Sequence, residues 1–392
     1  MFSYGAMLES PQLSLFQAGG NFISRVATRK PSVLEGEDRA SRRPIRIGLL
    51  VPFRGADAIW GPSCQYSGVL AAAELNQKGG ILGRPVQLSA ADAGGDPELV
   101  EDRVRKLLAT DGADVLIGVH LSSVRERLSR AFGNLIPYIF TPLYEGGATE
   151  DGTFAIGETP ANQLAGAVDH FTSDLGARSW FLMGHDYVWP RKTHDWLSRH
   201  LRASGCEVSG EEYHDLNEDN FEAALDRIER ARPSVVMQSL VGSACLEFNR
   251  AFARRGLDRH VLRLSGALEE NTLMALEPEA RRNLYCVSSY FASLDCRSNR
   301  DFLERYYAVF GKTAPVQSAL SISCYDGMNF FAALAEGAGS ISLSRLGEAF
   351  HRGLVFEAAK GAVHLVNGTS VSPTYLAKAG EAGFDIVKRF AP

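Results

Sequence analysis

Groups that could bind a small polar molecule follow several apolar segments of the sequence. Ser122 stands where a helix is expected to begin, and a serine there either caps the helix or leaves its first amides free for an anion or a carbonyl oxygen. Aromatic, hydroxyl and small residues also follow three other predicted strands, in segments 141–146, 185–191 and 241–243. A ligand with a polar head and an apolar body needs this mixture. Each aromatic residue alone is better explained by ordinary packing, so the prediction depends on the clustering.

The sequence carries no complete signature of a catalytic or nucleotide-binding site. Gly-Lys-Thr at 311–313 resembles the end of a phosphate-binding loop, but the first glycine of that motif would fall at Tyr306. No GxSxG, HExxH or SxxK motif with its partners is present. His185, Asp186 and His194 could act as an acid–base set, although exposed turn and helix positions explain them better. The sequence therefore predicts a binding protein and not an enzyme, without a cofactor.

Composition and charge restrict the class of protein. The chain has 392 residues, of which 45% are apolar and 22% charged, as in ordinary globular proteins. At this length we expect about two or three domains. The net charge of -5 gives no basic excess, so direct nucleic-acid binding is not expected. No segment reaches the ~18 apolar residues of a membrane span. The six scattered cysteines, with no CxxC pair and no histidine cluster for a metal, are expected to be mostly reduced core residues.

Short apolar segments alternate with amphipathic ones along most of the chain. Segment 45–52 has the pattern of a buried strand, and a helix from Pro62 to the Gly79-Gly80 stop follows it. The alternation continues with strands predicted at 86–91, 114–118, 137–140, 179–184, 207–212, 234–240, 261–265 and 284–290, and helices at 97–108, 122–132, 161–175, 190–204, 221–231, 246–255, 299–310 and 318–336. This order favours an α/β fold with two doubly wound parallel-sheet lobes, whose strand ends converge on one cleft.

The same patterns predict the domain boundaries. Residues 1–44 end in a charged run without hydrophobic period, which is typical of a flexible leader. We expect lobe 1 to comprise 45–157 and 290–355, and lobe 2 to comprise 158–289 and 356–392, joined by a multi-strand hinge. Residues 1–18 contain no Lys or Arg and carry Glu9, so they do not resemble a signal peptide. A cytoplasmic location is therefore expected, with the periplasm as the alternative if the true start differs.

Four segments resemble the type I periplasmic binding proteins for branched amino acids, urea and amides. They are 45–50, 75–86, 92–97 and 117–118 followed by Ser122. The resemblance covers residues 45 to about 390. Segments 143–146, 184–191, 240–243 and 290–295 are most similar to the amide-sensing and urea-binding branch. The family fold is a Venus flytrap, in which two lobes close around a ligand.

The resemblance also implies which residues contact the ligand. Ser122 matches the family serine that meets the ligand's polar head. Phe140 and Pro142 stand where the amide sensor has a tyrosine and a threonine, and Tyr187 and Trp189 match two pocket tyrosines. Because several hydroxyl groups are lost, a bulkier or more apolar ligand than a small amide is expected.

An amino acid ligand stays an alternative. Glu269 and Glu270 lie near the position where amino-acid binders hold an acidic partner for the ligand's ammonium group. The full set of predicted ligand-binding residues is Ser122, Phe140, Pro142, Tyr144, Tyr187, Trp189, Ser243, Glu269 and Tyr290.

Two functions are compatible with this resemblance. The first is a cytoplasmic sensor that closes around an amide, urea or a related molecule and regulates a partner protein, as the amide sensor sequesters an RNA-binding antiterminator of an amidase operon. The alternative is the substrate-binding protein of an ABC importer for amides, urea or branched amino acids, whose partner is a permease. A homo-oligomer is compatible with both. An enzyme that uses Asp186 and His194 is a weaker third hypothesis.

Overall fold

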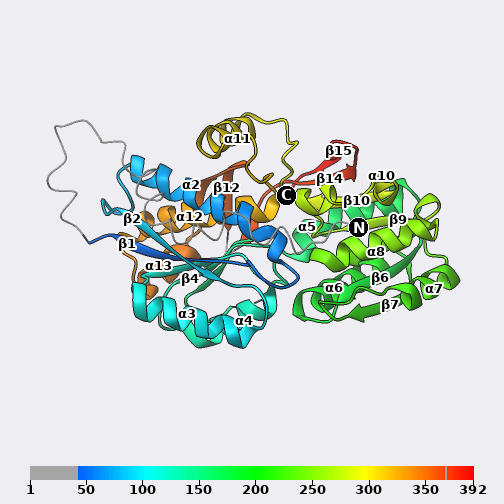
Figure 1. Ribbon diagram of the computed structural model, residues 1–392, viewed down its shortest axis with the longest axis horizontal. Coiled ribbons are helices and arrows are strands. Elements are labelled where there is room, and N and C mark those ends of the chain that lie inside the picture. Colours follow the sequence, from blue (N-terminus) through cyan, green and yellow to red (C-terminus); the bar gives the residue numbers. More distant parts are fainter. Residues whose placement is uncertain (1–42, 148, 367–368) are drawn as a thin grey trace.

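The computed structural model describes residues 43–147, 149–366 and 369–392, which form two α/β lobes side by side (Figure 1). Each lobe is built around a sheet of mainly parallel strands, so the predicted fold class is confirmed. The predicted leader, residues 1–44, lies almost entirely outside the described residues.

The sheet of the first lobe has five parallel strands. They are β1 (Ile45–Val51), β2 (Val86–Asp92), β3 (Val115–Gly118), β4 (Tyr138–Phe140) and β5 (Thr153–Ala155). Their order is β2-β1-β3-β4-β5. Successive side chains of a strand point to opposite faces, so Val115 and Ile117 pack against one layer of helices and Leu116 against the other. Both faces are therefore buried.

Helices cover both faces of this sheet. They are α2 (Gly61–Gln77), α3 (Pro97–Asp111), α4 (Ser122–Phe132), α11 (Arg297–Phe310), α12 (Ala319–Ala338) and α13 (Leu343–His351), with the 3₁₀-helix η2 (Ala58–Trp60) before α2. Figure 1 shows α2 and α12 on one face and α3 and α4 on the other. The ends of α3 show how local sequence sets a helix. The side chain of Asp96 accepts hydrogen bonds from the amides of Glu98 and Leu99, and Gly112, at a φ of 62°, ends the helix.

The second lobe has a seven-stranded sheet. Its strands are β6 (Ser179–His185), β7 (Glu207–His214), β8 (Val235–Ser239), β9 (Leu262–Ser265), β10 (Leu284–Ser288), β14 (Thr374–Ala379) and β15 (Phe384–Phe390), in the order β15-β14-β10-β9-β8-β6-β7. Its helices are α5 (Pro160–Asp169) with the π-turn η3 (His170–Asp174), α6 (Val188–Ala203), α7 (Glu222–Ala231), α8 (Gly242–Arg254), η4 (Leu257–Arg259), α9 (Glu270–Met274) and α10 (Pro278–Arg281). Only β14 and β15 run antiparallel to their neighbours.

A small antiparallel sheet precedes the two C-terminal strands. It contains β11 (Leu354–Ala358), β12 (Gly361–Val366) and β13 (Thr369–Val371). Its inward residues pack on α12, where the rings of Phe356 and Phe330 lie 5.6 Å apart edge to face. Strands β11 and β12 therefore lie against the helices of the first lobe, whereas the sequence pattern assigned 356–392 as a whole to the second. This packing favours a last lobe boundary near residue 372.

Several elements differ from their predicted limits for local reasons. The helix expected from Leu246 begins at Gly242, because a glycine with a positive φ looks like a loop residue in a sequence. The strand expected to reach Tyr290 ends at Ser288. The short elements α9, α10 and β5 carry too few residues to show a hydrophobic period, and neither they nor α13 were expected.

Three segments of the chain connect the lobes, at 156–159, 289–296 and 372–373. The β11–β12 turn adds a partly buried ion pair beside them, since the ammonium of Lys360 donates to Oε1 of Glu158 at 3.0 Å and to the hydroxyl of Ser289 at 2.6 Å. Burial alone would raise the pKa of Glu158, but the charge of Lys360 and the Ser289 hydrogen bond hold it below its ordinary value. This ion pair links two of the three connections to the small sheet.

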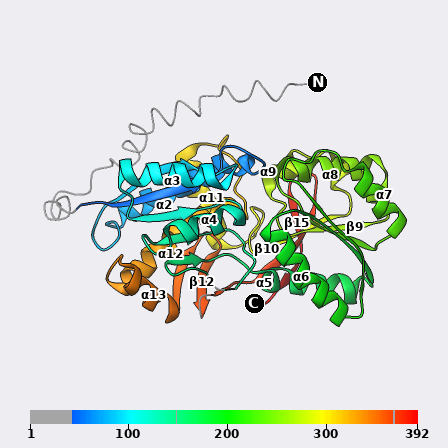
Figure 2. The ribbon, with the colours of Figure 1, turned by 90° about the horizontal axis from the view of Figure 1, so that it is seen from below.

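The two lobes touch at the start of α8. A Cβ placed on Gly242, which has a φ of +59°, would lie 1.6 Å from the carbonyl oxygen of Ala56 in the loop before η2. Figure 2 shows the two lobes side by side, with the C-terminal strand β15, in red, within the green lobe. A glycine is thus needed twice at this position, for its backbone conformation and for the approach of the other lobe.

Replacing Gly242 should therefore oppose the contact between the lobes. Gly256→Ala is a matched control, because Gly256 also has a positive φ of +72° but has no neighbouring atom within 4 Å of an added Cβ. Both variants should lose about 1 kcal/mol of stability through backbone strain. Only Gly242→Ala should enlarge the radius of gyration measured by small-angle X-ray scattering. Equal scattering from the two variants would contradict the contact.

Candidate functional site: the face between the lobes

A hydrophobic cluster joins the two lobes where their strands end. From the first lobe come Trp60, Leu121 after β3, and Leu320; from the second come Tyr187 after β6 and Val241 after β8. The carboxyl ends of parallel strands are where ligands bind in open α/β sheets. The interlobe face, as we call the surface around these residues, is therefore the candidate site.

Asp57 lies on the interlobe face in the loop between β1 and η2. Its residue is 1% exposed, and neither carboxylate oxygen has a hydrogen-bond partner among the described residues. Burial, with a smaller contribution from the charge of Asp92, raises the pKa of Asp57 to about 7. A buried carboxylate without a partner is unfavourable, so this position is suited to receive a hydrogen-bond donor.

Arg125 and Glu145 form a buried ion pair nearby. Arg125 is one turn after Ser122 on α4, and Glu145 follows β4. The guanidinium carbon of Arg125 lies 5.7 Å from the ring centre of Phe140, a cation–π contact. The ion pair leaves Nε of Arg125 and Oε2 of Glu145 buried without a partner among the residues that the structure describes. The first lobe thus presents unused donors and acceptors after three strands, β1, β3 and β4.

Tyr187 faces these groups from the second lobe. Burial raises the pKa of its phenol well above the ordinary value, and the negative charges of Asp57 and Glu145 raise it further. The phenol therefore keeps its proton at neutral pH and can donate a hydrogen bond. Its ring lies 6.5 Å from that of Trp189, which is 3% exposed and occupies the second position of α6.

Three helices begin at this face without a side-chain cap. The residues before α4, α6 and α8 are Leu121, Tyr187 and Val241, which cannot cap through a side-chain oxygen as Asp96 does for α3. In α4 the first intrahelical bond runs from the amide of Arg125, so the preceding amides point out of the helix end. A partly negative ligand group is favoured at such an end.

The structure brings several predicted ligand-binding residues to this region. Ser122 is buried at the first position of α4, and Phe140 ends β4 under Arg125. Tyr144 is buried beside Glu145, and both burial and the Glu145 charge raise the pKa of its phenol. Pro142 is buried in the same loop, whereas Ser243 is exposed at the second position of α8.

Other predicted residues are engaged inside the protein. Both carboxylate oxygens of Glu269 cap α9 by accepting from Asn271 and Thr272, and Glu270 accepts from the amide of Ala292 at 2.7 Å. The hydroxyl of Tyr290 donates to Oδ1 of Asn299, and the residue is 1% exposed. A ligand contact at these residues stays a prediction. Both carboxylate oxygens of Glu269 already accept hydrogen bonds from α9.

The acid–base set considered from the sequence does not assemble. Asp186 is exposed and pairs with Arg191 at 2.6 Å. His194 is buried in α6, where Nε2 lies 3.0 Å from the hydroxyl of Ser239, and burial lowers the pKa of its imidazole to about 3. Both side chains are explained by local structure.

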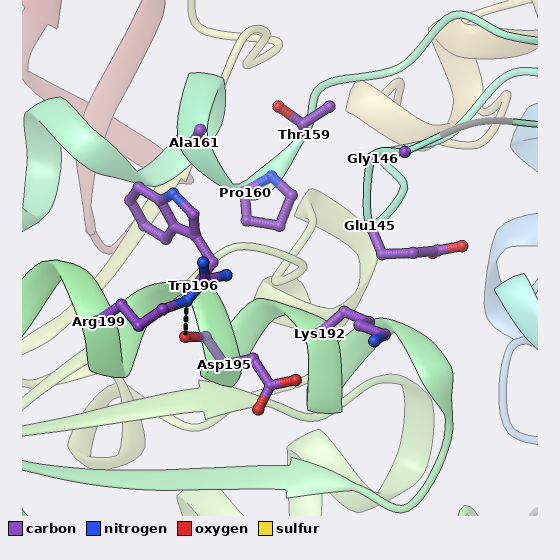
Figure 3. A pocket seen from close by; sticks show the side chains of 10 residues that line it. Glu145, Gly146, Thr159, Pro160, Ala161, Lys192, Asp195, Trp196 and Arg199 are labelled. Carbon is purple, nitrogen blue, oxygen red and sulfur yellow. Dashed lines mark hydrogen bonds between the residues drawn. The ribbon is translucent and has the colours of Figure 1, made fainter.

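A cavity of about 340 Å³ lies beside the interlobe face. Figure 3 shows side chains of α6, namely Lys192, Trp196 and Arg199, directed toward segment 159–161 and Glu145. Glu145 belongs both to this cavity and to the ion pair with Arg125. A ligand of moderate size could therefore extend from the interlobe face along α6.

Sequence reasoning missed the charged residues of the site. Asp57 follows the first predicted strand, and Arg125 lies three positions after Ser122, on the same side of its helix. The rule that strand ends converge could have drawn attention to both. The lack of partners among the described residues for the oxygens of Asp57 and for Nε of Arg125, however, is a property of the folded chain.

Comparison with known proteins assigns the family. The profile of the family described as "Periplasmic binding protein" matches residues 44–383, so the chain belongs to that family of ligand-binding proteins. A curated relative, the Leu/Ile/Val-binding protein BraC3 of Rhizobium johnstonii, is 36% identical over 80 residues, which span 20% of this chain and 22% of that protein.

Solved structures share the fold over nearly the whole chain. A solute-binding protein of an ABC transporter from Rhodopseudomonas palustris HaA2, in complex with p-hydroxybenzoic acid, has a TM-score of 0.79 and 16% identity, covering 89% of this chain and 97% of that one. A leucine-binding protein from Thermotoga maritima MSB8 has a TM-score of 0.78 and 17% identity, covering 89% and 99%. An amino acid ABC transporter substrate-binding protein from Pseudomonas fluorescens Pf-5 has a TM-score of 0.75 and 20% identity, covering 90% and 96%.

Membrane-spanning helices and metal-binding clusters are both absent from the described residues. No helix within them is long and apolar enough to cross a membrane. Within the same ranges, no group of three or more His, Cys, Asp or Glu side chains is arranged to hold a metal ion.

Glu145→Ala should destabilise the protein markedly. It leaves the guanidinium of Arg125 buried without its carboxylate, which costs about 3 kcal/mol of unfolding free energy. Asp295→Ala is the control, because the Asp295–Arg300 ion pair is exposed and its loss should change little. Urea unfolding followed by circular dichroism measures both. Similar midpoints for the two variants would contradict a buried Arg125–Glu145 pair.

Proposed function

We propose that the chain is the substrate-binding protein of an ABC importer, which closes around a small molecule and presents it to a permease. The observation that carries this proposal is the interlobe face itself, where Asp57, Arg125 and Glu145 keep buried polar atoms without a partner in the described structure. A binding protein needs such groups between its lobes, whereas an enzyme would also need a reactive group beside them.

Ligand binding would control the relation between the lobes. A ligand changes the balance between open and closed forms only through its different affinity for the two. A 100-fold change in that balance requires about 2.7 kcal/mol, which two or three hydrogen bonds at the interlobe face can supply. Contacts to the uncapped starts of α4 and α6 would exist only when both lobes meet the ligand.

The sensor function, which the sequence placed first, is the second candidate. The similarity of segments such as 143–146 and 184–191 to the amide-sensing branch favours it. The proteins with similar structures are described as ABC transporter components, which supports the importer instead. The two proposals differ in partner, permease or antiterminator-type regulator, and in location. Cell fractionation separates them, because an importer subunit belongs outside the cytoplasm and the sensor within it.

A thermal-shift panel tests for ligand binding. We expect at least one compound among leucine, acetamide, urea and 4-hydroxybenzoate to raise the melting temperature. A ligand at 100 times its Kd adds about 2.7 kcal/mol, which corresponds to roughly 3 °C for a protein of this size. Glucose, which belongs to none of these classes, is the control. Melting curves that no compound moves would count against a binding function for these ligand classes.

Ser122→Ala should weaken binding of the compound so identified by about 5-fold to 10-fold, the effect of one hydrogen bond. Ser129→Ala is the matched control on the same helix, because its hydroxyl bonds that of Thr153 at 2.7 Å and lies away from the second lobe. Isothermal titration calorimetry measures both affinities. An unchanged Kd in Ser122→Ala would remove Ser122 from the site.

A further inference from the structure

Asp57 differs from the other acidic residues around the interlobe face. Glu145 is paired with Arg125, Glu269 caps α9, and Asp92 accepts from the amides of Phe53 and Gly94. Asp57 has the same degree of burial as these residues or more, yet both of its oxygens lack a partner among the described residues. The carboxylate oxygens of Asp57 can therefore accept hydrogen bonds from two or more donors.

The surroundings of Asp57 place its carboxylate between the two lobes. The preceding residue, Ala56, touches Gly242 at the start of α8, and Trp60 of the adjoining η2 packs in the cluster that includes Tyr187. The charge of Asp57 also acts on the phenol of Tyr187. A group bonded to Asp57 would thus lie against the second lobe as well as the first.

Two kinds of partner can relieve a buried carboxylate. It can take up a proton, which the raised pKa of Asp57 permits near neutral pH, or it can pair with a positively charged donor. A charged donor gives the stronger hydrogen bonds and restores the ionised form. An anionic ligand group at the same place would instead add a second negative charge.

We propose that Asp57 binds a positively charged nitrogen of the ligand, an ammonium or amidinium group, when the lobes close. The inference rests on the proposed function and narrows its ligand class to cationic or zwitterionic molecules. In a zwitterion such as an amino acid, the carboxylate would then be met at the uncapped start of α4, where Ser122 lies. This assigns to Asp57 the ammonium contact that the sequence suggested for Glu269.

Closure then depends on the charge of the ligand. In the ligand-free protein an ionised Asp57 must lose its water when the lobes meet, which favours separation of the lobes. A cationic group compensates that loss, whereas a neutral amide does so only in part. The same side chain would therefore both select the ligand and oppose closure without it.

Matched ligand pairs test this proposal. Leucine is compared with 4-methylpentanoate, which lacks only the amino group, and benzamidine with benzoate. In whichever pair binds, we expect calorimetry to give at least 10-fold tighter binding for the compound with the ammonium or amidinium group. We expect Asp57→Asn to remove that advantage. Asp96→Asn is the control, because Asp96 is an exposed helix cap that an asparagine can replace, and its affinities should not change.

Each outcome decides the matter. Equal or tighter binding of 4-methylpentanoate or benzoate, or an Asp57→Asn variant that keeps the full preference, would overturn the role of Asp57 and leave the binding function standing. Absence of binding by all four compounds and by the earlier panel would overturn both. If Asp57→Asn does not fold, equal or tighter binding of 4-methylpentanoate or benzoate by the unaltered protein still overturns the role of Asp57.

Discussion

Bringing two lobes together over charged side chains is unfavourable unless each charge finds a partner. This constraint governs the interlobe face, because parallel strands in both lobes end there and their following loops carry polar groups. Arg125 and Glu145 satisfy each other in part, whereas Asp57 does not. Buried polar atoms of the interlobe face thus lack hydrogen-bond partners among the described residues, and a molecule with complementary groups would supply them. Binding and closure become one process for that reason.

The rest of the fold positions the interlobe face and does not cover it. The sheets are covered on both sides by helices, so their strands offer ligands only their ends. The Glu158–Lys360–Ser289 contacts lie behind the face, at the connections between lobes. The partners of Lys360 belong to two different connections, so this one side chain ties both connections to the small sheet.

Much of the architecture could be predicted from residue patterns. Helix α4 begins and ends where the sequence indicated, and β1 was recognised from its apolar run, because burial on both faces leaves a clear signal. The lobe against which the C-terminal strands pack was harder to predict, since alternation shows that a strand has a buried face but not which helix covers it. The site was harder. Glu269 looks like a free acid in the sequence, and only the folded chain shows that it caps α9, while Asp57 carries no motif at all.

The three connections between the lobes have a mechanical consequence. A single connection would let one lobe rotate about any axis relative to the other. Three connections restrict twisting and sliding of the lobes, so that bending about one axis is the easiest motion. The distance between the outer rims of the lobes then changes with this single bending angle. A docking partner that grips both rims could distinguish an occupied molecule from an empty one by span alone, without touching the bound compound.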